Sequence, residues 1–256
     1  MHGVANEQQT LEEFRAAVPG KRQWATTVFK RLEQIAPVQP PARLLDIGAA
    51  GGSFVIACSE LGYEAVGVEP WAPARTRAAE LARELGANVR VVEGSAESIP
   101  FPDGSFDVVH ASSVIEHVLD VQRALTEVHR VLAPNGVFWF NAASAMCPRQ
   151  DEIRGFPLFG WYPDSLKQHI MRWARDHRPE LVQYSKTPAI NWFTPGRARA
   201  LLGKVGFRAV YDRWDLRLAE EGGAGYRVAL RAIRSSRAAR VLADVLVSGC
   251  SYAALK

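Results

Sequence analysis

The run from Leu44 to Phe54, LLDIGAAGGSF, constrains this chain more than any other feature. An apolar strand enters a turn of small residues, and the turn opens into a helix. Such a turn lets backbone N–H groups approach a nucleotide-like ligand closely. Asp46 stands just before the first glycine, Gly48, and an acid there would repel the pyrophosphate that a dinucleotide-binding turn holds. The sequence therefore predicts a site for a cationic or amino-bearing ligand.

Strand and helix patterns alternate along most of the 256 residues, of which 48% are hydrophobic. This content can fill the core of one large α/β domain, and the alternation is typical of βαβ units. We expect a Rossmann-like, doubly wound and mostly parallel seven-stranded sheet with helices on both faces. The expected strands cover 43–47, 65–68, 89–92, 106–110, 137–141, 207–216 and 250–255. The expected helices cover 7–35, 53–61, 72–85, 121–132, 195–205 and 226–246.

The alternation stops after Ala142, in a stretch rich in aromatic residues and prolines. This stretch is too long for a plain connection, so we interpret it as a partly helical insertion after the fifth strand. We expect an N-terminal helical cap over 1–41, a core over 42–143 and 195–256, and an insertion over 144–194 that forms a lid on the substrate site.

Composition narrows the class of protein. The net charge of +4 is a mild basic bias that does not by itself indicate nucleic acid. Cys58, Cys147 and Cys250 lie far apart without metal-ligand spacing and fit a reducing compartment. The polar start of the chain predicts no signal peptide, and no apolar run approaches the length of a bilayer span. We expect a cytoplasmic protein without a metal site, and the oligomeric state stays open.

A second acid, Glu69, ends the second expected strand about 20 residues after Gly48. An acid at this place can accept hydrogen bonds from both ribose hydroxyls of an adenosine-type ligand. The alternative is an acid that the dipole of the next helix favours. Because the glycine turn lies upstream, the ribose role is the preferred interpretation.

These motifs together resemble the class I S-adenosylmethionine-dependent methyltransferases, of the small-molecule group related to the ubiquinone and menaquinone biosynthesis methyltransferases. The segments that carry the resemblance are 44–54, 66–70, 93–101, 106–118 and 132–140. The resemblance implies S-adenosylmethionine as cofactor and a small or medium organic acceptor, with oxygen as the expected acceptor atom. It specifies fold and cofactor better than substrate.

The resemblance also implies roles for individual residues. Asp46 would face the amino group of the cofactor, Glu69 would bind its ribose, and the turn after Gly94 would lie against adenine. The implied cofactor-binding residues are Asp46, Gly48, Ala49, Gly52, Glu69, Pro70, Ser95, Ala96, Glu97, Ala111 and Ser112.

Two residues depart from the family pattern. Ala50 stands where the family usually has glycine, and Ser95 stands where it usually has aspartate. The loss of charge assistance at Ser95 would weaken cofactor binding by ~1 kcal/mol. These departures keep open a non-catalytic, cofactor-binding partner subunit as an alternative function.

His117 is the candidate catalytic residue, because the resemblance implies that the Glu116-His117 pair after the fourth strand lies near the methyl-transfer centre. As a general base it could accept a proton from a substrate hydroxyl or amine. The alternative is a histidine that only holds the loop.

Aromatic residues of the insertion are the candidate substrate-binding residues, and the alternative is that they form the core of the insertion. They are Trp161, Tyr162, Tyr184, Trp192 and Phe193.

Other functions are less favoured. A nucleic-acid methyltransferase remains an alternative, but no Asn-Pro-Pro-Tyr-like motif is present, and Cys147-Pro148 reverses the order expected of a cytosine nucleophile. Asp46 disfavours an NAD-dependent dehydrogenase. Arginines recur at helical spacing between Arg227 and Arg240. We interpret them as a solvated helix face, with a membrane surface or another anion as the alternative.

Overall fold

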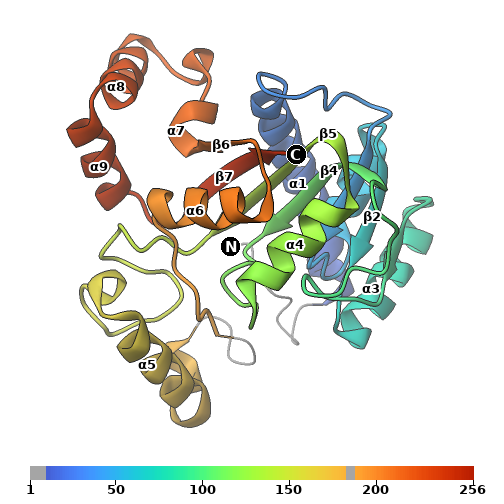
Figure 1. Cartoon of the computed structure of the whole chain (residues 1–256). Coiled ribbons are helices and arrows are strands. Elements are labelled where there is room, and N and C mark those ends of the chain that lie inside the picture. Colours follow the sequence, from blue (N-terminus) through green and yellow to red (C-terminus); the bar gives the residue numbers. More distant parts are fainter. Residues whose placement is uncertain (1–9, 183–187) are drawn as a thin grey trace.

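The structure, a computed structural model, describes residues 10–182 and 188–256. These residues form a seven-stranded sheet with the order β3-β2-β1-β4-β5-β7-β6 (Figure 1). Strands β1 to β5 pair in parallel, whereas β7 is antiparallel to both β5 and β6. The strands are β1 (Arg43–Ile47), β2 (Glu64–Val68), β3 (Arg90–Val92), β4 (Phe106–Ser112), β5 (Leu132–Ala142), β6 (Ala209–Asp212) and β7 (Cys250–Leu255). The predicted Rossmann-like, mostly parallel sheet is therefore confirmed.

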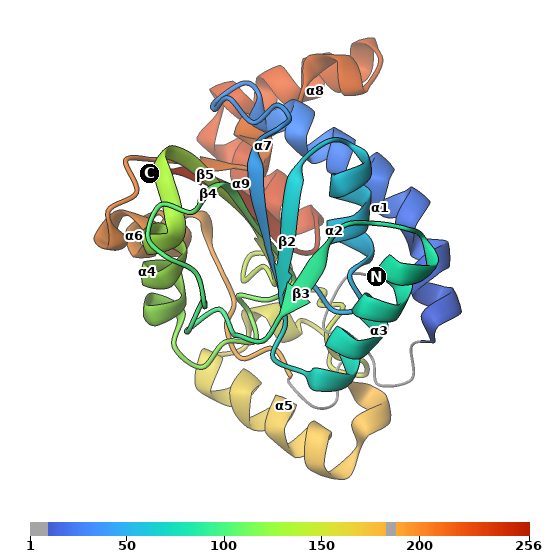
Figure 2. The same cartoon turned by 90° about the vertical axis from the view of Figure 1, so that its right-hand side faces the viewer.

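Helices cover both faces of this sheet (Figure 2). Helices α1, α2 and α3 pack together on one face, and α4 and α6 pack together on the other. In the described ranges, no helix combines the length and the apolarity needed to cross a membrane. The α-helices are α1 (Leu11–Leu32), α2 (Ser53–Glu60), α3 (Ala72–Glu84), α4 (Val121–Val131), α5 (Asp164–His177), α6 (Pro195–Val205), α7 (Arg213–Leu216), α8 (Ala224–Ser235) and α9 (Arg237–Leu246). Short 3-10 helices are η1 (Phe159–Trp161), η2 (Pro179–Leu181) and η3 (Ala219–Glu221).

The central strands are buried on both faces, as expected of a parallel sheet between two layers of helices. In β4, Val108 belongs to the hydrophobic core that includes residues of α1, and Val109 belongs to the core that includes residues of α4 and α6. The strand order turns back between β1 and β4, which are neighbours in the sheet. Open α/β sheets bind ligands at the carboxyl ends of the strands at such a point.

Several elements differ from the sequence-based expectation; β5, for example, begins at Leu132 and not near residue 137. The predicted helix over 226–246 is two helices, because the Ser236 side chain accepts the N–H of Ala239 and begins α9. The predicted strand over 207–216 ends early, because Asp212 caps the short helix α7.

The first predicted helix corresponds to α1. Thr10 and Glu13 form a capping box, so the helix begins at Leu11. Residues 7–9 of the predicted helix lie outside the described residues.

The segment between β5 and α6 has a hydrophobic core of its own, which includes Phe159, Met171 and Trp192. Backbone hydrogen bonds also join this segment to the loop after β4. The backbone N–H groups of Ile190 and Asn191 both donate to the carbonyl of Glu116, at 2.8 and 3.0 Å. The described part of the segment is therefore held beside the carboxyl ends of the strands.

Candidate active site

Three cavities meet at the carboxyl ends of β1, β4 and β5. The helix-covered cavity, of about 590 Å³, lies between α1 and the turn after β1. The apolar slot, of about 170 Å³, lies on the other side of Gly48 and reaches Glu69. The polar cavity, of about 680 Å³, lies beyond Trp24 and His117. Gly48 lines the first two cavities, His117 lines the slot and the polar cavity, and Trp24 lines the helix-covered and polar cavities.

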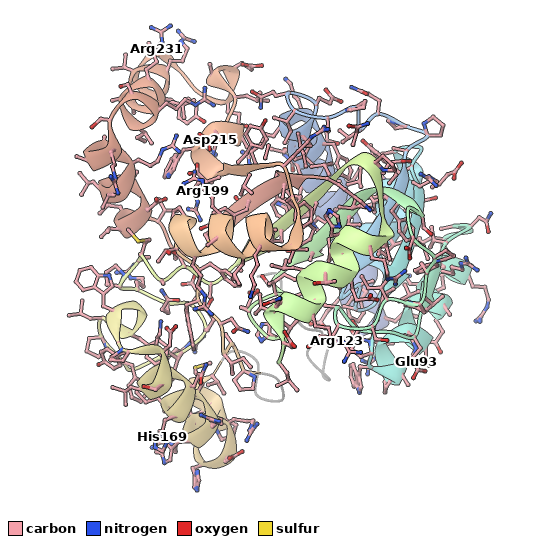
Figure 3. The ribbon with its side chains drawn as sticks, viewed as in Figure 1. Glu93, Arg123, His169, Arg199, Asp215 and Arg231 are labelled. Carbon is pink, nitrogen blue, oxygen red and sulfur yellow. The ribbon has the colours of Figure 1, made fainter. Side chains whose placement is uncertain are left out.

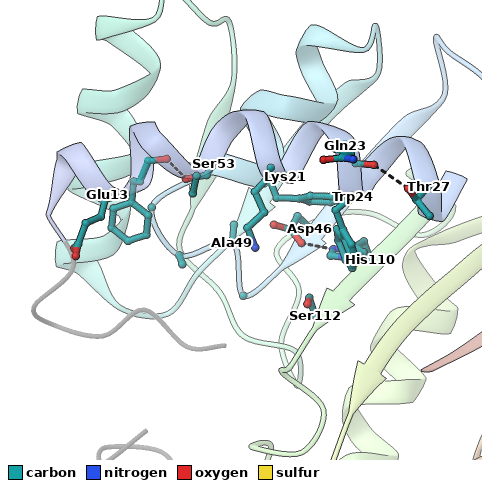
Figure 4. A pocket seen from close by; sticks show the side chains of 17 residues that line it. Glu13, Lys21, Gln23, Trp24, Thr27, Asp46, Ala49, Ser53, His110 and Ser112 are labelled. Atoms are coloured by element: carbon teal, nitrogen blue, oxygen red, sulfur yellow. Dashed lines mark hydrogen bonds and ion pairs between the residues drawn. The ribbon is translucent and has the colours of Figure 1, made fainter. Parts of the chain in front are cut away.

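The wall of the helix-covered cavity holds a buried hydrogen-bonded pair (Figure 4). Asp46 and His110 are paired across β1 and β4, and Asp46 Oδ1 lies 2.6 Å from His110 Nδ1. Burial lowers the pKa of His110, although Asp46 opposes this effect. The neutral ring therefore donates Nδ1–H to Asp46 and leaves Nε2 as an acceptor.

Two buried polar atoms in this cavity wall lack a hydrogen-bond partner among the described residues. These atoms are His110 Nε2 and Ser112 Oγ. The His110 ring cannot easily turn away, because it stacks on Trp139 with ring centroids 5.0 Å apart and on Phe54 at 4.1 Å. A buried acceptor that is held in place requires a donor from a ligand or water.

Helix α1 adds a cation to the same cavity. Lys21 lines it, and burial lowers the pKa of Lys21 while the charge of Asp46 raises it. One wall thus offers a carboxylate, an imidazole acceptor and an ammonium group. This combination matches the ammonium and carboxylate groups of a free amino acid.

The turn itself leaves little room for larger residues. A Cβ atom on Gly48, at φ +72°, would lie 2.5 Å from Val114 Cγ2. A Cβ atom on Gly51 would lie 2.5 Å from the ring of Phe14, which α1 supplies. Ala50 has a φ of +49°, a left-handed conformation that costs a non-glycine residue about 1–2 kcal/mol. The turn therefore accommodates Ala50 at the expense of backbone strain.

Glu69 is fixed by two backbone hydrogen bonds at the end of β2. Its Oε2 accepts the N–H of Ala50 and its Oε1 accepts the N–H of Trp71, both at 3.0 Å. Burial raises the pKa of Glu69, and the two backbone bonds oppose that rise. Each oxygen keeps a lone pair that can accept another donor. The carboxylate thus supports the start of α3 and also lines the slot.

The apolar slot brings together residues that lie far apart in the sequence. Glu97 Oε1 accepts the N–H of Leu119 at 3.0 Å, which ties the turn after β3 to the loop after β4. Its mostly apolar walls suit a flat ring with a few polar edges. The slot is lined by Ile47, Gly48, Glu69, Pro70, Ser95, Ala96, Glu97, Val114, His117, Val118 and Leu119.

Most of the predicted cofactor-binding residues line one of these two cavities, but two do not. Asp46, Gly48, Ala49 and Ser112 line the helix-covered cavity. Gly52 instead begins α2, where its Cα faces Ala78 and Val91. Ala111 is fully buried in the core between the sheet and α4. Contact of Gly52 and Ala111 with the cofactor stays a prediction, because neither residue lines a described cavity.

The polar cavity contains the segment after β4. The Glu116 side chain is 4% exposed, and its Oε1 lies 4.0 Å from His117 Nε2. Burial raises the pKa of Glu116 well above its ordinary value, and nearby Glu152 raises it further. The Oε2 atoms of both glutamates are buried without a hydrogen-bond partner among the described residues. His117, the candidate catalytic residue, therefore lies where the slot opens toward a pair of buried carboxyl groups.

The aromatic residues predicted to bind substrate lie elsewhere. Trp192 is fully buried with Phe159 in the core of the segment, and Phe193 packs on Phe140 in the main core. Trp161 is 54% exposed, and Tyr162 packs against Phe159. None of these four residues lines a described cavity. Packing therefore explains the positions of Tyr162, Trp192 and Phe193, and Tyr184 lies outside the described residues.

Sequence reasoning did not assign several residues of the site. Lys21 and Trp24 lie one turn apart on α1, but their spacing does not show that α1 covers the turn. His110 could have been paired with Asp46 from the alignment of β1 and β4. No sequence pattern marks Arg149, which lines the polar cavity.

Comparisons with known proteins agree with this geometry. Residues 45–140 match the family described as a methyltransferase domain. An uncharacterized methyltransferase, YcgJ of Bacillus subtilis, is 42% identical over 97 residues, or 38% of each chain. A ubiquinone biosynthesis O-methyltransferase of Azorhizobium caulinodans is 38% identical over 96 residues, which cover 37% of this chain and 38% of the relative.

A solved S-adenosylmethionine-dependent methyltransferase from Mesorhizobium loti shares the fold. Its TM-score is 0.59 at 17% identity, and the match covers 93% of this chain and 100% of that one. Residues 45–140 are thus a methyltransferase domain, and the predicted class I, S-adenosylmethionine-dependent type is confirmed for this segment. The matches span about two-fifths of the length of these two curated relatives.

Proposed function

We propose that this chain transfers a methyl group from S-adenosylmethionine to the oxygen of a small or medium organic acceptor. The observation that carries the proposal is the meeting of three cavities around Gly48, Trp24 and His117. One suits an amino acid group, one suits a flat ring beside a fixed carboxylate, and the third leads to solvent-facing loops. This arrangement matches a cofactor that joins an amino acid to a nucleoside and needs an acceptor beside it.

The residues present fit that cofactor. Asp46 and the orphaned His110 Nε2 would receive its ammonium group, and Lys21 would pair with its carboxylate. Glu69 would accept hydrogen bonds from the ribose, and the slot from Ser95 to Glu97 would hold adenine. When bound, S-adenosylmethionine supplies a methyl group on a positively charged sulfur.

The protein then has three tasks. It aligns the acceptor with the methyl group, excludes water and takes up the proton that a hydroxyl acceptor releases. His117, which lines both the slot and the polar cavity, is the proton-accepting group beside them. An oxygen acceptor is supported by the name of the ubiquinone biosynthesis relative. A cytoplasmic location is part of the proposal and is supported by three buried cysteines without disulfides.

Calorimetric titration with S-adenosylmethionine and S-adenosylhomocysteine tests the proposal. We expect Glu69→Ala to weaken the binding of S-adenosylhomocysteine by about 10- to 100-fold, because hydrogen bonds to a charged group are lost. Glu220→Ala is the matched control, because Glu220 is exposed and lies outside these cavities.

Binding of both compounds, followed by transfer of a labelled methyl group to an added phenol, would support the proposal. NADH binding in place of both compounds would contradict it. Unchanged affinity in Glu69→Ala would contradict the ribose role alone.

A further inference from the structure

The polar cavity carries charged groups of opposite sign, and they come from different parts of the chain. Its walls contain five arginines and three carboxylic residues. The arginines are Arg31, Arg149, Arg154, Arg213 and Arg217, and the carboxylic residues are Glu116, Asp151 and Glu152. None of the described aromatic residues of the predicted lid lines this cavity; Trp24 and Trp139 are its aromatic lining residues, and charged side chains outnumber them.

Three of the five arginines already have acceptors within the protein. Arg31 and Arg217 both contact Glu221, at 2.6 and 3.3 Å. Arg213 donates to the carbonyl of Gly249. These bonds hold the wall together and leave little of that charge for a ligand.

Arg149 and Arg154 are different. Both lie in the loop that follows β5, and both are exposed at the rim of the cavity. Within 10–182 and 188–256, neither guanidinium group has an ion pair, a hydrogen bond or an aromatic partner. Asp151 and Glu152 lie between them in the sequence and line the same cavity, but neither acid forms an ion pair with Arg149 or Arg154. Two unpaired guanidinium groups on one rim suit a carboxylate or a phosphate, which they can bind with paired N–H groups.

Two buried carboxyl groups, those of Glu116 and Glu152, line the same cavity. The Oε2 atoms of Glu116 and Glu152 lack hydrogen-bond partners among the described residues, and the Glu116 side chain is 4% exposed. Glu116 adjoins His117, which reaches the slot. A buried carboxyl oxygen without a partner is costly, so a ligand that donates a hydrogen bond there would relieve that cost.

We infer that the methyl acceptor is a small anion whose carboxylate or phosphate binds Arg149 and Arg154 and whose hydroxyl donates a hydrogen bond to Glu116. This inference rests on the proposed function and names the substrate class of the same site. The anionic group lies at the rim and the hydroxyl lies beside His117, so the charged end is held away from the methyl group.

Four phenols serve as probes of this arrangement. Phenol, 4-hydroxybenzoate, 4-hydroxyphenyl phosphate and tyramine share the hydroxyl and differ in the charge opposite it. Each is titrated calorimetrically into the protein saturated with S-adenosylhomocysteine. We expect at least one of the two anions to bind about tenfold or more tightly than phenol. The stronger of the two identifies the bound group as carboxylate or phosphate.

The double variant Arg149→Gln and Arg154→Gln should lose this preference and keep its affinity for S-adenosylhomocysteine. Arg231→Gln is the matched control and should keep both, because Arg231 projects from the outer side of α8, away from the cavity (Figure 3). The hydroxyl end is tested with benzoate, which lacks the hydroxyl. Wild type should prefer 4-hydroxybenzoate over benzoate, and Glu116→Ala should not.

Several results would overturn the inference. The inference fails if neither anion binds more tightly than phenol, or if tyramine binds most tightly of the four. It also fails if the double variant still prefers an anion over phenol. Absence of binding by all four probes also overturns it. The titration of S-adenosylhomocysteine alone reports on the proposed function, so the two failures remain distinguishable.

Discussion

The Glu116 carboxyl group should make the protein less stable as the pH rises, and Glu116→Gln should remove that effect. Burial of this side chain raises its pKa well above the ordinary value of 4.5, and the charge of Glu152 adds to the rise. His117 Nε2 lies 4.0 Å from Glu116 Oε1, and no arginine or lysine forms an ion pair with Glu116 among the described residues. The folded protein therefore keeps a proton on Glu116 at pH values where the unfolded chain has lost it.

The sign and size follow from proton binding. Between pH 4.5 and the raised folded pKa, the folded state binds more protons than the unfolded state. The free energy of unfolding then falls as pH rises, by up to about 1.4 kcal/mol per pH unit. Glutamine has nearly the same shape and does not titrate. The stability of Glu116→Gln relative to wild type should therefore increase, by up to about that amount per pH unit, between pH 5 and the raised pKa of folded Glu116.

Urea unfolding followed by circular dichroism at pH 5, 6 and 7 measures this difference. Glu220→Gln is the control, because this exposed side chain should leave the curve parallel to that of wild type. Parallel curves for Glu116→Gln and wild type would refute the argument, since they would mean that Glu116 ionises alike in the folded and unfolded states.

Three further predictions concern the turn and the cofactor cavities. Gly48→Ala should lower the free energy of unfolding by about 2–5 kcal/mol in urea, because it adds left-handed strain and overlap with Val114; a loss below about 1 kcal/mol would show that the turn relaxes. Ser95→Asp should tighten S-adenosylhomocysteine binding about fivefold in calorimetry by restoring charge assistance, and unchanged or weaker binding would remove Ser95 from the adenine contact. Acidification below pH 6.5 should destabilise the protein through His110, because its folded pKa is lowered and the unfolded state binds the extra proton. His110→Gln should flatten that part of the stability curve, and an unchanged slope would contradict the neutral ring.

Much of the fold could be predicted because the local sequence signals for helices, strands and turns agree with the pattern of buried residues. The bounds of β1 and α6 match the prediction: β1 is an apolar run that ends in the turn, and Thr194 and Pro195 mark the start of α6. The division of α8 from α9 was missed because Ser236 has moderate helix propensity and its cap forms only in the folded chain.

The site was partly predictable for a similar reason. Asp46 and Glu69 lie at strand ends, where topology alone places side chains at the ligand edge of the sheet. By contrast, residue type alone does not show whether an aromatic side chain packs in a hydrophobic core or lines a pocket. Trp192 and Phe193 pack in hydrophobic cores. The polar cavity depends on how a loop packs against distant strands, so Arg149 carries no local signal.

A crystal structure of the protein with S-adenosylhomocysteine tests the central claim most directly. The account predicts ribose hydroxyls on Glu69, the amino group within hydrogen-bond distance of Asp46 or His110 Nε2, and adenine in the slot beside Ser95. A complex in which the ligand lies outside the two cavities that share Gly48, or in which Glu69 contacts no part of the ligand, would contradict it.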